Sequence, residues 1–167
     1  MLDGLANTEN IISIYTDGAA RGNPGPGGYG AVLLWKNHKK EIAKGFRHTT
    51  NNRMELLAVI EALKLVKIPN SDIIVYSDSK YVVEAVEQKW LFDWERIKFK
   101  KKKNPDLWLE FLKLYRKHNV KLQWVKGHSD NEYNNRCDQL AVWASKNDNT
   151  NIDKVYEELD QDLKLDL

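Results

Sequence analysis

A continuous run of apolar residues from Ile73 to Tyr76 limits the possible architectures of this chain more than any other part of the sequence. A strand covered by helices on both faces is apolar at every position, whereas a half-exposed strand alternates apolar and polar residues. A helical pattern precedes the run, since Leu56, Val59 and Leu63 repeat at helical spacing. The sequence therefore predicts a sheet that lies between layers of helices.

The remaining elements can be ordered around this strand. Further strands are expected at residues 11–16, 29–35, 41–49 and 120–125, and the glycine-rich stretch 18–28 reads as a loop. Helices are expected from Asn51 or Asn52 as the N-cap, over 79–89, from Asn104-Pro105 to about 118, and over 134–146. This order predicts an α/β (mixed α+β) fold with a five-stranded mixed sheet and helices on both faces.

Charge divides the chain into parts. Its 167 residues fit one domain, which we expect at 11–147 after a loose lead-in at 1–10. Residues 89–103 hold seven basic and two acidic side chains, whereas residues 148–167 hold seven acidic and two basic ones. The basic block indicates a polyanionic partner. The acidic end is expected to be a frayed tail.

Cellular setting is predicted from what the sequence lacks. Cys137 is the single cysteine, so no internal disulfide can form. No stretch approaches the roughly 20 apolar residues that cross a bilayer, and the first residues lack the basic start and apolar run of a secretory signal. We expect a cytoplasmic protein with no membrane partner.

Four acidic residues are the candidate chemical centre. Asp17 and Asp78 end predicted strands, Glu55 lies in the first turn of a predicted helix, and Asp138 lies early in the last helix. Taken singly, each also fits a turn, a cap or a helix N-terminus. Brought together, the four would repel one another and need cations to stay ionised. Oxygen-only ligands favour Mg²⁺ or Mn²⁺ over zinc.

The sequence motifs around these acids resemble those of type 1 ribonuclease H, in its bacterial form with a basic protrusion. They follow the order of that family over about residues 11–146. The motifs are Tyr15-Thr16-Asp17-Gly18, Gly22-Asn23-Pro24-Gly25-Pro26-Gly27-Gly28-Tyr29-Gly30, Thr49-Thr50-Asn51-Asn52-Arg53-Met54-Glu55-Leu56, Tyr76-Ser77-Asp78-Ser79, Trp124-Val125-Lys126-Gly127-His128 and Asn134-Asn135-Arg136-Cys137-Asp138.

The resemblance implies a ribonuclease H-like fold and an endonuclease that cuts the RNA strand of RNA–DNA hybrids, leaving a 3′-hydroxyl and a 5′-phosphate. It implies a monomer whose metal ligands are Asp17, Glu55, Asp78 and Asp138. Two Mg²⁺ ions, which Mn²⁺ can replace, would stabilise the attacking water and the leaving oxygen. The resemblance ties His128 to proton transfer or product release; by itself it reads as a surface-loop histidine.

Substrate contacts are implied at two places. Asn23, Asn51 and Asn52 would line the minor groove, where the 2′-hydroxyl distinguishes RNA from DNA, and Thr50 would contact a DNA phosphate. Asn23 also fits a turn and Asn51 a helix cap, and these readings are compatible with contact to a ligand. Residues 89–103 look like the basic protrusion.

Within that protrusion, the resemblance assigns hybrid binding to Trp90, Trp94, Lys98, Lys100 and Lys101. Packing of the two tryptophans against the body of the protein is an equally good reading.

The chain also departs from the family at three positions. Phe99 stands in place of a tryptophan, Lys80 in place of a glutamine, and His48 in place of an arginine that contributes to phosphate binding. These departures bear on affinity for the substrate rather than on the chemistry.

Two other functions stay open at this stage. One is a non-catalytic module that binds RNA–DNA hybrids, and the other is a different nuclease of the same fold. A binder of polyanions gains nothing from clustered acids, which argues against the first. The continuous word from Asn51 to Glu55 and the basic protrusion favour the hybrid-specific enzyme over the second.

Overall fold

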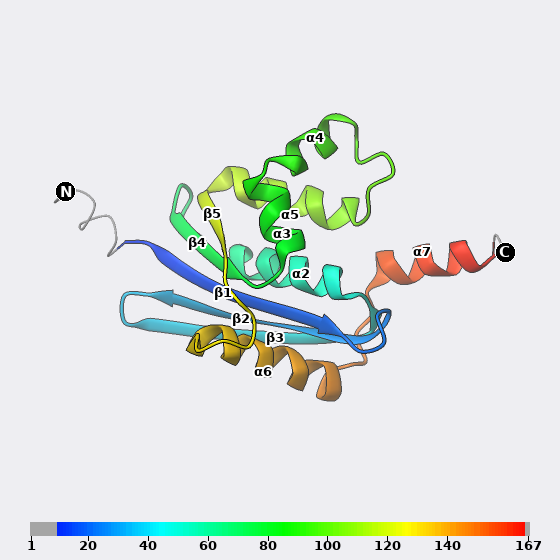
Figure 1. Cartoon of the computed structure of the whole chain (residues 1–167), viewed down its shortest axis with the longest axis horizontal. Helices are drawn as coiled ribbons and strands as arrows, with labels where there is room; N and C mark the ends of the chain where they lie inside the picture. Colours follow the sequence, from blue (N-terminus) through cyan, green and yellow to red (C-terminus); the bar gives the residue numbers. More distant parts are fainter. Residues whose placement is uncertain (1–9, 166–167) are drawn as a thin grey trace.

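The computed structural model describes residues 10–165 and forms a five-stranded mixed sheet in the order β3-β2-β1-β4-β5 (Figure 1). Strands β1, β2 and β3 pair antiparallel, and β4 pairs parallel with both β1 and β5. The predicted mixed sheet is confirmed. The strands are β1 (Ile12–Ala20), β2 (Gly25–Trp35), β3 (His38–Thr49), β4 (Asp72–Ser77) and β5 (Asn119–Trp124).

Helices cover both faces of the sheet, as expected (Figure 1). On one face lie α2 (Asn51–Lys64), α3 (Lys80–Glu87) and α5 (Pro105–Lys117). The opposite face is covered by α6 (Glu132–Asn147), and α4 (Trp90–Arg96) and α7 (Lys154–Leu165) lie at the periphery. Between residues 10 and 165, no helix combines the length and the apolar character needed to cross a membrane.

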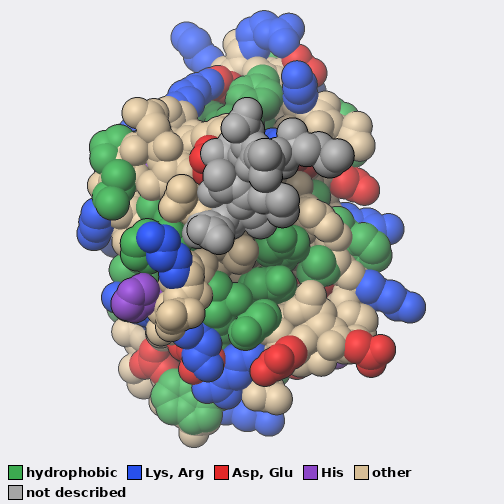
Figure 2. Space-filling model, turned by 90° about the vertical axis from the view of Figure 1, so that its left-hand side faces the viewer, with side chains coloured by type: hydrophobic (Ala, Val, Ile, Leu, Met, Phe, Trp, Pro, Cys, Tyr) green, Lys and Arg blue, Asp and Glu red, His purple; other side chains and the backbone are tan. Residues whose placement is uncertain are grey.

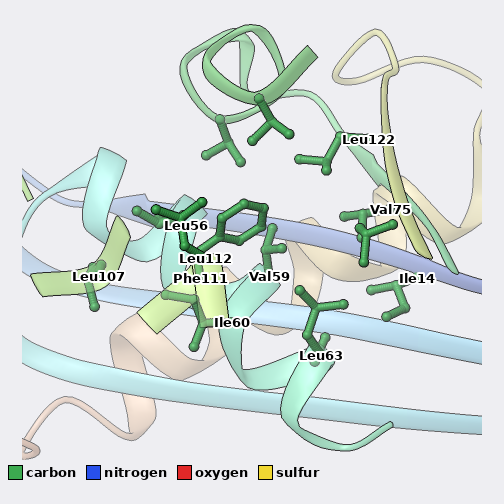
Figure 3. Packing of buried hydrophobic residues seen from close by; sticks show 14 of the residues in the cluster. Ile14, Leu56, Val59, Ile60, Leu63, Val75, Leu107, Phe111, Leu112 and Leu122 are labelled. Atoms are coloured by element: carbon green, nitrogen blue, oxygen red, sulfur yellow. The ribbon is translucent and has the colours of Figure 1, made fainter. Parts of the chain in front are cut away.

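The main core fills the space between the sheet and the helices α2, α3 and α5. Figure 3 shows Leu56 and Ile60 of α2 and Phe111 of α5 packed toward Ile14 of β1 and Val75 of β4. All five side chains are fully buried. At about 25 cal/mol per Å² of buried apolar surface, side chains of this size each contribute roughly 1.5–3 kcal/mol, so this layer holds the strand ends in place.

The glycine-rich stretch is mostly strand, so the expectation of a loop over 18–28 is wrong. β1 continues to Ala20, and β2 begins at Gly25. Pairing of Gly18 with Tyr29 and of Ala20 with Gly27 extends the antiparallel ladder through these residues. The ladder hydrogen bonds outweigh the low strand propensity of glycine, and the turn shrinks to residues 21–24.

The acidic end is not frayed, so that expectation is also wrong. Residues 154–165 form α7, and Asp153 just before it is buried. Glu157 pairs with Arg47 at 2.8 Å, and Asp160 lies 3.0 Å from His48. Burial of Asp153 and contacts with β3 therefore order a segment whose composition alone indicated a solvated tail.

Candidate active site

Asp17 and Asp78 lie near each other at the carboxyl-terminal end of β4, because β1 and β4 are adjacent and run parallel. Thr16 lies opposite Ser77 in the register, so the next residues along each strand emerge side by side. Asp78 follows the last residue of β4, as expected, but Asp17 lies inside the longer β1 and not at its end. The parallel register, rather than the end of β1, fixes the position of this carboxylate.

Glu55 approaches these two acids from α2. The helix is capped by Thr50, whose side chain accepts a hydrogen bond from the Arg53 N–H at 3.2 Å. Glu55 is the fifth helical residue, so the prediction that it occupies the first turn is wrong. Gly18 permits the approach, because a Cβ atom there would lie 2.4 Å from the Met54 carbonyl carbon and 2.6 Å from the Glu55 nitrogen.

Three of the four predicted acids form a tight cluster. One carboxylate oxygen from each of Asp17, Glu55 and Asp78 lies within 4.8 Å of the others. Asp138, on α6, does not belong to this group within the described residues. It is nevertheless close enough for its charge to raise the pKa values of Asp17 and Asp78. The site is therefore a compact triad with a fourth acid beside it.

Burial and mutual repulsion disfavour the ionised form of the triad. Burial, followed by the charge of Asp78, raises the pKa of Asp17 to about 8. Burial and the neighbouring acids also raise the pKa of Glu55 well above its ordinary value, and burial raises that of Asp78. Asp17 accepts a hydrogen bond from the Gly18 N–H at 2.9 Å, whereas Glu55 Oε2 is buried with no hydrogen-bond partner in the described structure.

These groups fit a divalent cation. A buried carboxylate oxygen without a donor is costly unless something positive faces it. The triad offers only hard oxygen ligands, which suit Mg²⁺ or Mn²⁺ better than zinc. A cation bound there would offset the repulsion that raises the pKa values.

The loop after β5 borders the triad. Gly127 faces Asp78 so closely that a Cβ atom would lie 2.7 Å from Asp78 Oδ2. His128 is exposed, and its charge partly opposes the effect of burial on the pKa of Asp78. The predicted catalytic histidine therefore lies beside the acids. Trp124 donates an indole N–H to the Asp78 carbonyl at 3.1 Å.

The asparagines join the β1–β2 turn to the start of α2. Asn23 Oδ1 accepts a hydrogen bond from the Asn51 N–H at 2.9 Å, and Asn51 Oδ1 accepts one from the Ala20 N–H at 2.5 Å. Asn51 is not the helix cap, because Thr50 takes that position. Asn52 is exposed. Asn51 and Asn52 thus begin the helix that carries Glu55, and Asn23 is hydrogen-bonded to its first residue.

A hollow of about 360 Å³ separates the start of α3 from the protrusion. Asn52, Trp90, Trp94 and Lys101 line it, together with Lys80, which stands in place of the family's glutamine. Four further lining residues were not selected as substrate contacts from the sequence: Tyr81, Glu84, Lys102 and Lys103. Lys98 and Lys100 are exposed but do not line it.

The two tryptophans of the protrusion differ. Trp94 packs edge-on against the buried Trp108, with ring centroids 6.0 Å apart, so the packing interpretation holds for it. Trp90 keeps 46% of its surface exposed and is available to a ligand. Phe99, which stands where the family has a tryptophan, is part of the core.

A second hollow, larger than the one beside the protrusion, lies away from the acids. It measures about 600 Å³ and is lined by Ile12, Leu33, Trp35 and Ile68, among others. Figure 2 shows hydrophobic side chains gathered at this end of the molecule. Ile12 and Ile73 pair at the start of β1 and β4. The hollow therefore lies at the opposite end of these strands from Asp17 and Asp78.

A mixed sheet with converging carboxylates at one edge, beside a basic protrusion, is typical of nucleases that depend on metal ions. The family model for RNase H matches residues 9–146. The chain belongs to the ribonuclease H family.

Curated relatives and solved structures agree with this membership. Ribonuclease H of Desulforamulus reducens is 52% identical over 147 residues, which is 85% of this chain and 92% of the relative. Ribonuclease HI of Synechocystis is 45% identical over 158 residues, or 91% and 98% of the two chains.

Among solved structures, LC9-RNase H1, a type 1 RNase H with the type 2 active-site motif, matches with a TM-score of 0.75 and 28% identity, covering 90% of this chain and 80% of that one. LC11-RNase H1 in complex with an RNA/DNA hybrid matches with a TM-score of 0.59 and 30% identity, covering 81% and 96%.

Proposed function

We propose that this protein is an endonuclease that hydrolyses the RNA strand of RNA–DNA hybrids and leaves a 3′-hydroxyl and a 5′-phosphate. The observation that carries the proposal is the convergence of Asp17, Glu55 and Asp78 oxygens within 4.8 Å in a member of the ribonuclease H family. A solved neighbour was crystallised with an RNA/DNA hybrid, which supports the choice of substrate.

Asp17, Glu55 and Asp78, joined by Asp138, would hold two Mg²⁺ ions, and Mn²⁺ would serve in their place. Such ions lower the pKa of an attacking water and stabilise the departing oxygen of a phosphodiester. By holding such ions, the acids would position the scissile phosphate relative to the sheet. Because their side chains converge from strands and helices that pack on one core, they would supply orientation with little reorganisation during the reaction.

His128 would assist turnover from its exposed loop beside Asp78. An imidazole can accept or release a proton near neutral pH, so its ring nitrogens suit proton transfer at the edge of the site or the release of product. Substitution of His128 should therefore slow cleavage without abolishing it.

Recognition of the hybrid would be divided between two surfaces. Asn23, Asn51 and Asn52 lie together beside the triad, where side-chain amides can meet the 2′-hydroxyl in the minor groove. Thr50 would contact a DNA phosphate near the same segment. The hollow between α3 and the protrusion, with its lysines and Trp90, would take the DNA strand.

We further propose that the protein acts as a monomer in the cytoplasm. Residues 11–147 would be the catalytic domain, and residues 89–103 its basic protrusion.

The test compares three labelled duplexes, RNA–DNA hybrid, duplex RNA and duplex DNA, each with Mg²⁺ and with chelator. Wild type should cut only the hybrid, and only with metal. Asp78→Asn should lose nearly all cleavage while it still binds the hybrid, and the exposed Asp162→Asn on α7 serves as the matched control. Wild-type rates in Asp78→Asn, or cleavage of duplex DNA alone, would refute the proposal. Hybrid binding without cleavage by wild type would support a binding module.

A further inference from the structure

The C-terminal segment lies against β3, which is an edge strand of the sheet. Asn151 accepts a hydrogen bond from the Arg47 N–H at 2.9 Å through its carbonyl and donates its side-chain amide to the Gly45 carbonyl at 2.8 Å. Asp148 accepts from the Gly45 N–H at 3.2 Å. These bonds satisfy backbone groups that an edge strand otherwise leaves open, and they fix the register of the segment on β3.

This register brings Asp153 under the start of α2. Asp153 Oδ2 accepts hydrogen bonds from the Thr49 hydroxyl at 2.8 Å and from Arg53 Nε at 2.7 Å, and Oδ1 accepts one from Arg53 Nη2 at 2.9 Å. Asp153 is only 8% exposed, and Thr49 and Arg53 are equally hidden. One buried carboxylate therefore binds both ends of the stretch that contains residues 50–52.

Arg53 has a second carboxylate partner that provides a contrast. Asp106 of α5 accepts from Arg53 Nη1 at 2.9 Å and from Nη2 at 2.8 Å. Its side chain is 27% exposed, and its hydrogen bonds go to Arg53, not to Thr49. Both acids thus hold the guanidinium, but Asp153 alone among the described residues spans Thr49 and Arg53.

The rest of α7 is held differently. Its Glu157 meets Arg47, whose side chain is 54% exposed, and ion pairs at the surface contribute little to stability. Val155, Leu159 and Leu163 are exposed, so α7 presents apolar side chains to solvent rather than to β3. The strong attachment of the segment is therefore at Asp153.

We propose that Asp153 is a positioning residue for substrate binding, which fixes Thr50, Asn51 and Asn52 in the arrangement that meets the hybrid. This inference rests on the proposed function. Two-ended attachment leaves the segment little freedom, because Thr50 also caps α2 and Asn51 is tied to the β1–β2 turn. Without the carboxylate, Thr49 and Arg53 would each lose a buried partner, and the intervening residues would have to be ordered when substrate binds.

The test measures steady-state cleavage of a hybrid together with affinity for the same hybrid in chelator, read by fluorescence anisotropy. Asp153→Asn should raise KM and the dissociation constant at least fivefold, with kcat within about twofold of wild type. Thr49→Val, which keeps shape but removes the hydroxyl, should act in the same direction. Thr49→Ser should restore wild-type values. All assays are run well below each variant's unfolding midpoint.

Asp106→Asn is the matched control, because it removes an ion pair with the same guanidinium but leaves the Thr49 bond. It should lower the melting temperature as Asp153→Asn does, yet leave KM near wild type. Wild-type KM in both Asp153→Asn and Thr49→Val would overturn the inference, as would an equal rise in KM for Asp106→Asn. Failure of the proposed function shows separately, as a wild type that binds the hybrid but does not cut it.

Discussion

Replacing Asp17 with asparagine should stabilise the metal-free protein. Asparagine has the same shape, and its side-chain oxygen can still accept the hydrogen bond from the Gly18 N–H, 2.9 Å long in the native protein. It removes one negative charge from a cluster in which the charges of Asp78 and Asp138 repel it. The substitution therefore reduces the electrostatic repulsion within the site without opening a cavity.

The size of the effect follows from the pKa of Asp17. A rise from the ordinary value of 3.8 to about 8, at about 1.4 kcal/mol per pH unit, sets a ceiling of about 6 kcal/mol on the cost of ionising Asp17. The three carboxyls can share protons, so one replacement relieves part of the repulsion. We expect Asp17→Asn to be more stable than wild type by about 2–4 kcal/mol at pH 8 without metal.

The dependence on pH has a definite sign. The pKa of Asp17 is higher in the folded than in the unfolded protein, so the folded state binds more protons between about pH 4 and pH 8. Wild type should therefore lose stability as the pH rises through that window, and the advantage of Asp17→Asn should grow with it. Near pH 4 the two proteins should be almost equally stable.

Urea unfolding followed by circular dichroism, with chelator and with Mg²⁺, measures these differences. Mg²⁺ should stabilise wild type by mass action, and the variant much less. The reasoning is refuted if Asp17→Asn is no more stable than wild type at pH 8 in chelator. It is equally refuted if the difference between them does not change from pH 4 to pH 8.

Three further substitutions test the packing around the site. Gly127→Ala should lower kcat at least tenfold with a native circular dichroism spectrum, because its Cβ atom would lie 2.7 Å from Asp78 Oδ2; wild-type kcat would contradict this. Gly18→Ala should cost about 1–3 kcal/mol of unfolding free energy in urea, since the added atom meets the α2 backbone at Met54 at 2.4 Å. Phe111→Ala removes a fully buried ring and should cost about 3–5 kcal/mol, with smaller values implying that the core collapses around the gap.

Local patterns predicted the sheet and most of the helices correctly, because the features that create them are local. The apolar run at 73–76 became β4, and Asn104-Pro105 opens α5. The extension of β1 through Asp17 could not be predicted this way, since it depends on pairing with β2 rather than on the propensity of Gly18. The structure of residues 148–165 likewise depends on partners in β3 and α2 that are distant in sequence.

The candidate site shows the same division between local and long-range information. The family words selected Asp17, Glu55 and Asp78, and the structure brings these three together. Lys98 and Lys100 do not line the hollow beside the protrusion. They lie in an irregular segment, where the direction of a side chain cannot be predicted from the sequence. The contacts of Asp153 could not be predicted from the sequence either. They form only because the C-terminal segment packs against β3 and brings that carboxylate to Thr49 and Arg53.

The acids come from every layer of the fold. Asp17 belongs to the central strand β1 and Asp78 directly follows β4, whereas Glu55 belongs to a helix on one face and Asp138 to the helix on the opposite face. A cation held by all four would therefore link both helical layers across the sheet. Asp138 lies outside the tight triad. Its contact with a bound cation would therefore require the largest movement of a side chain among the four acids. Binding of metal and substrate should accordingly order the start of α6 and the loop that carries His128 more than it orders α2.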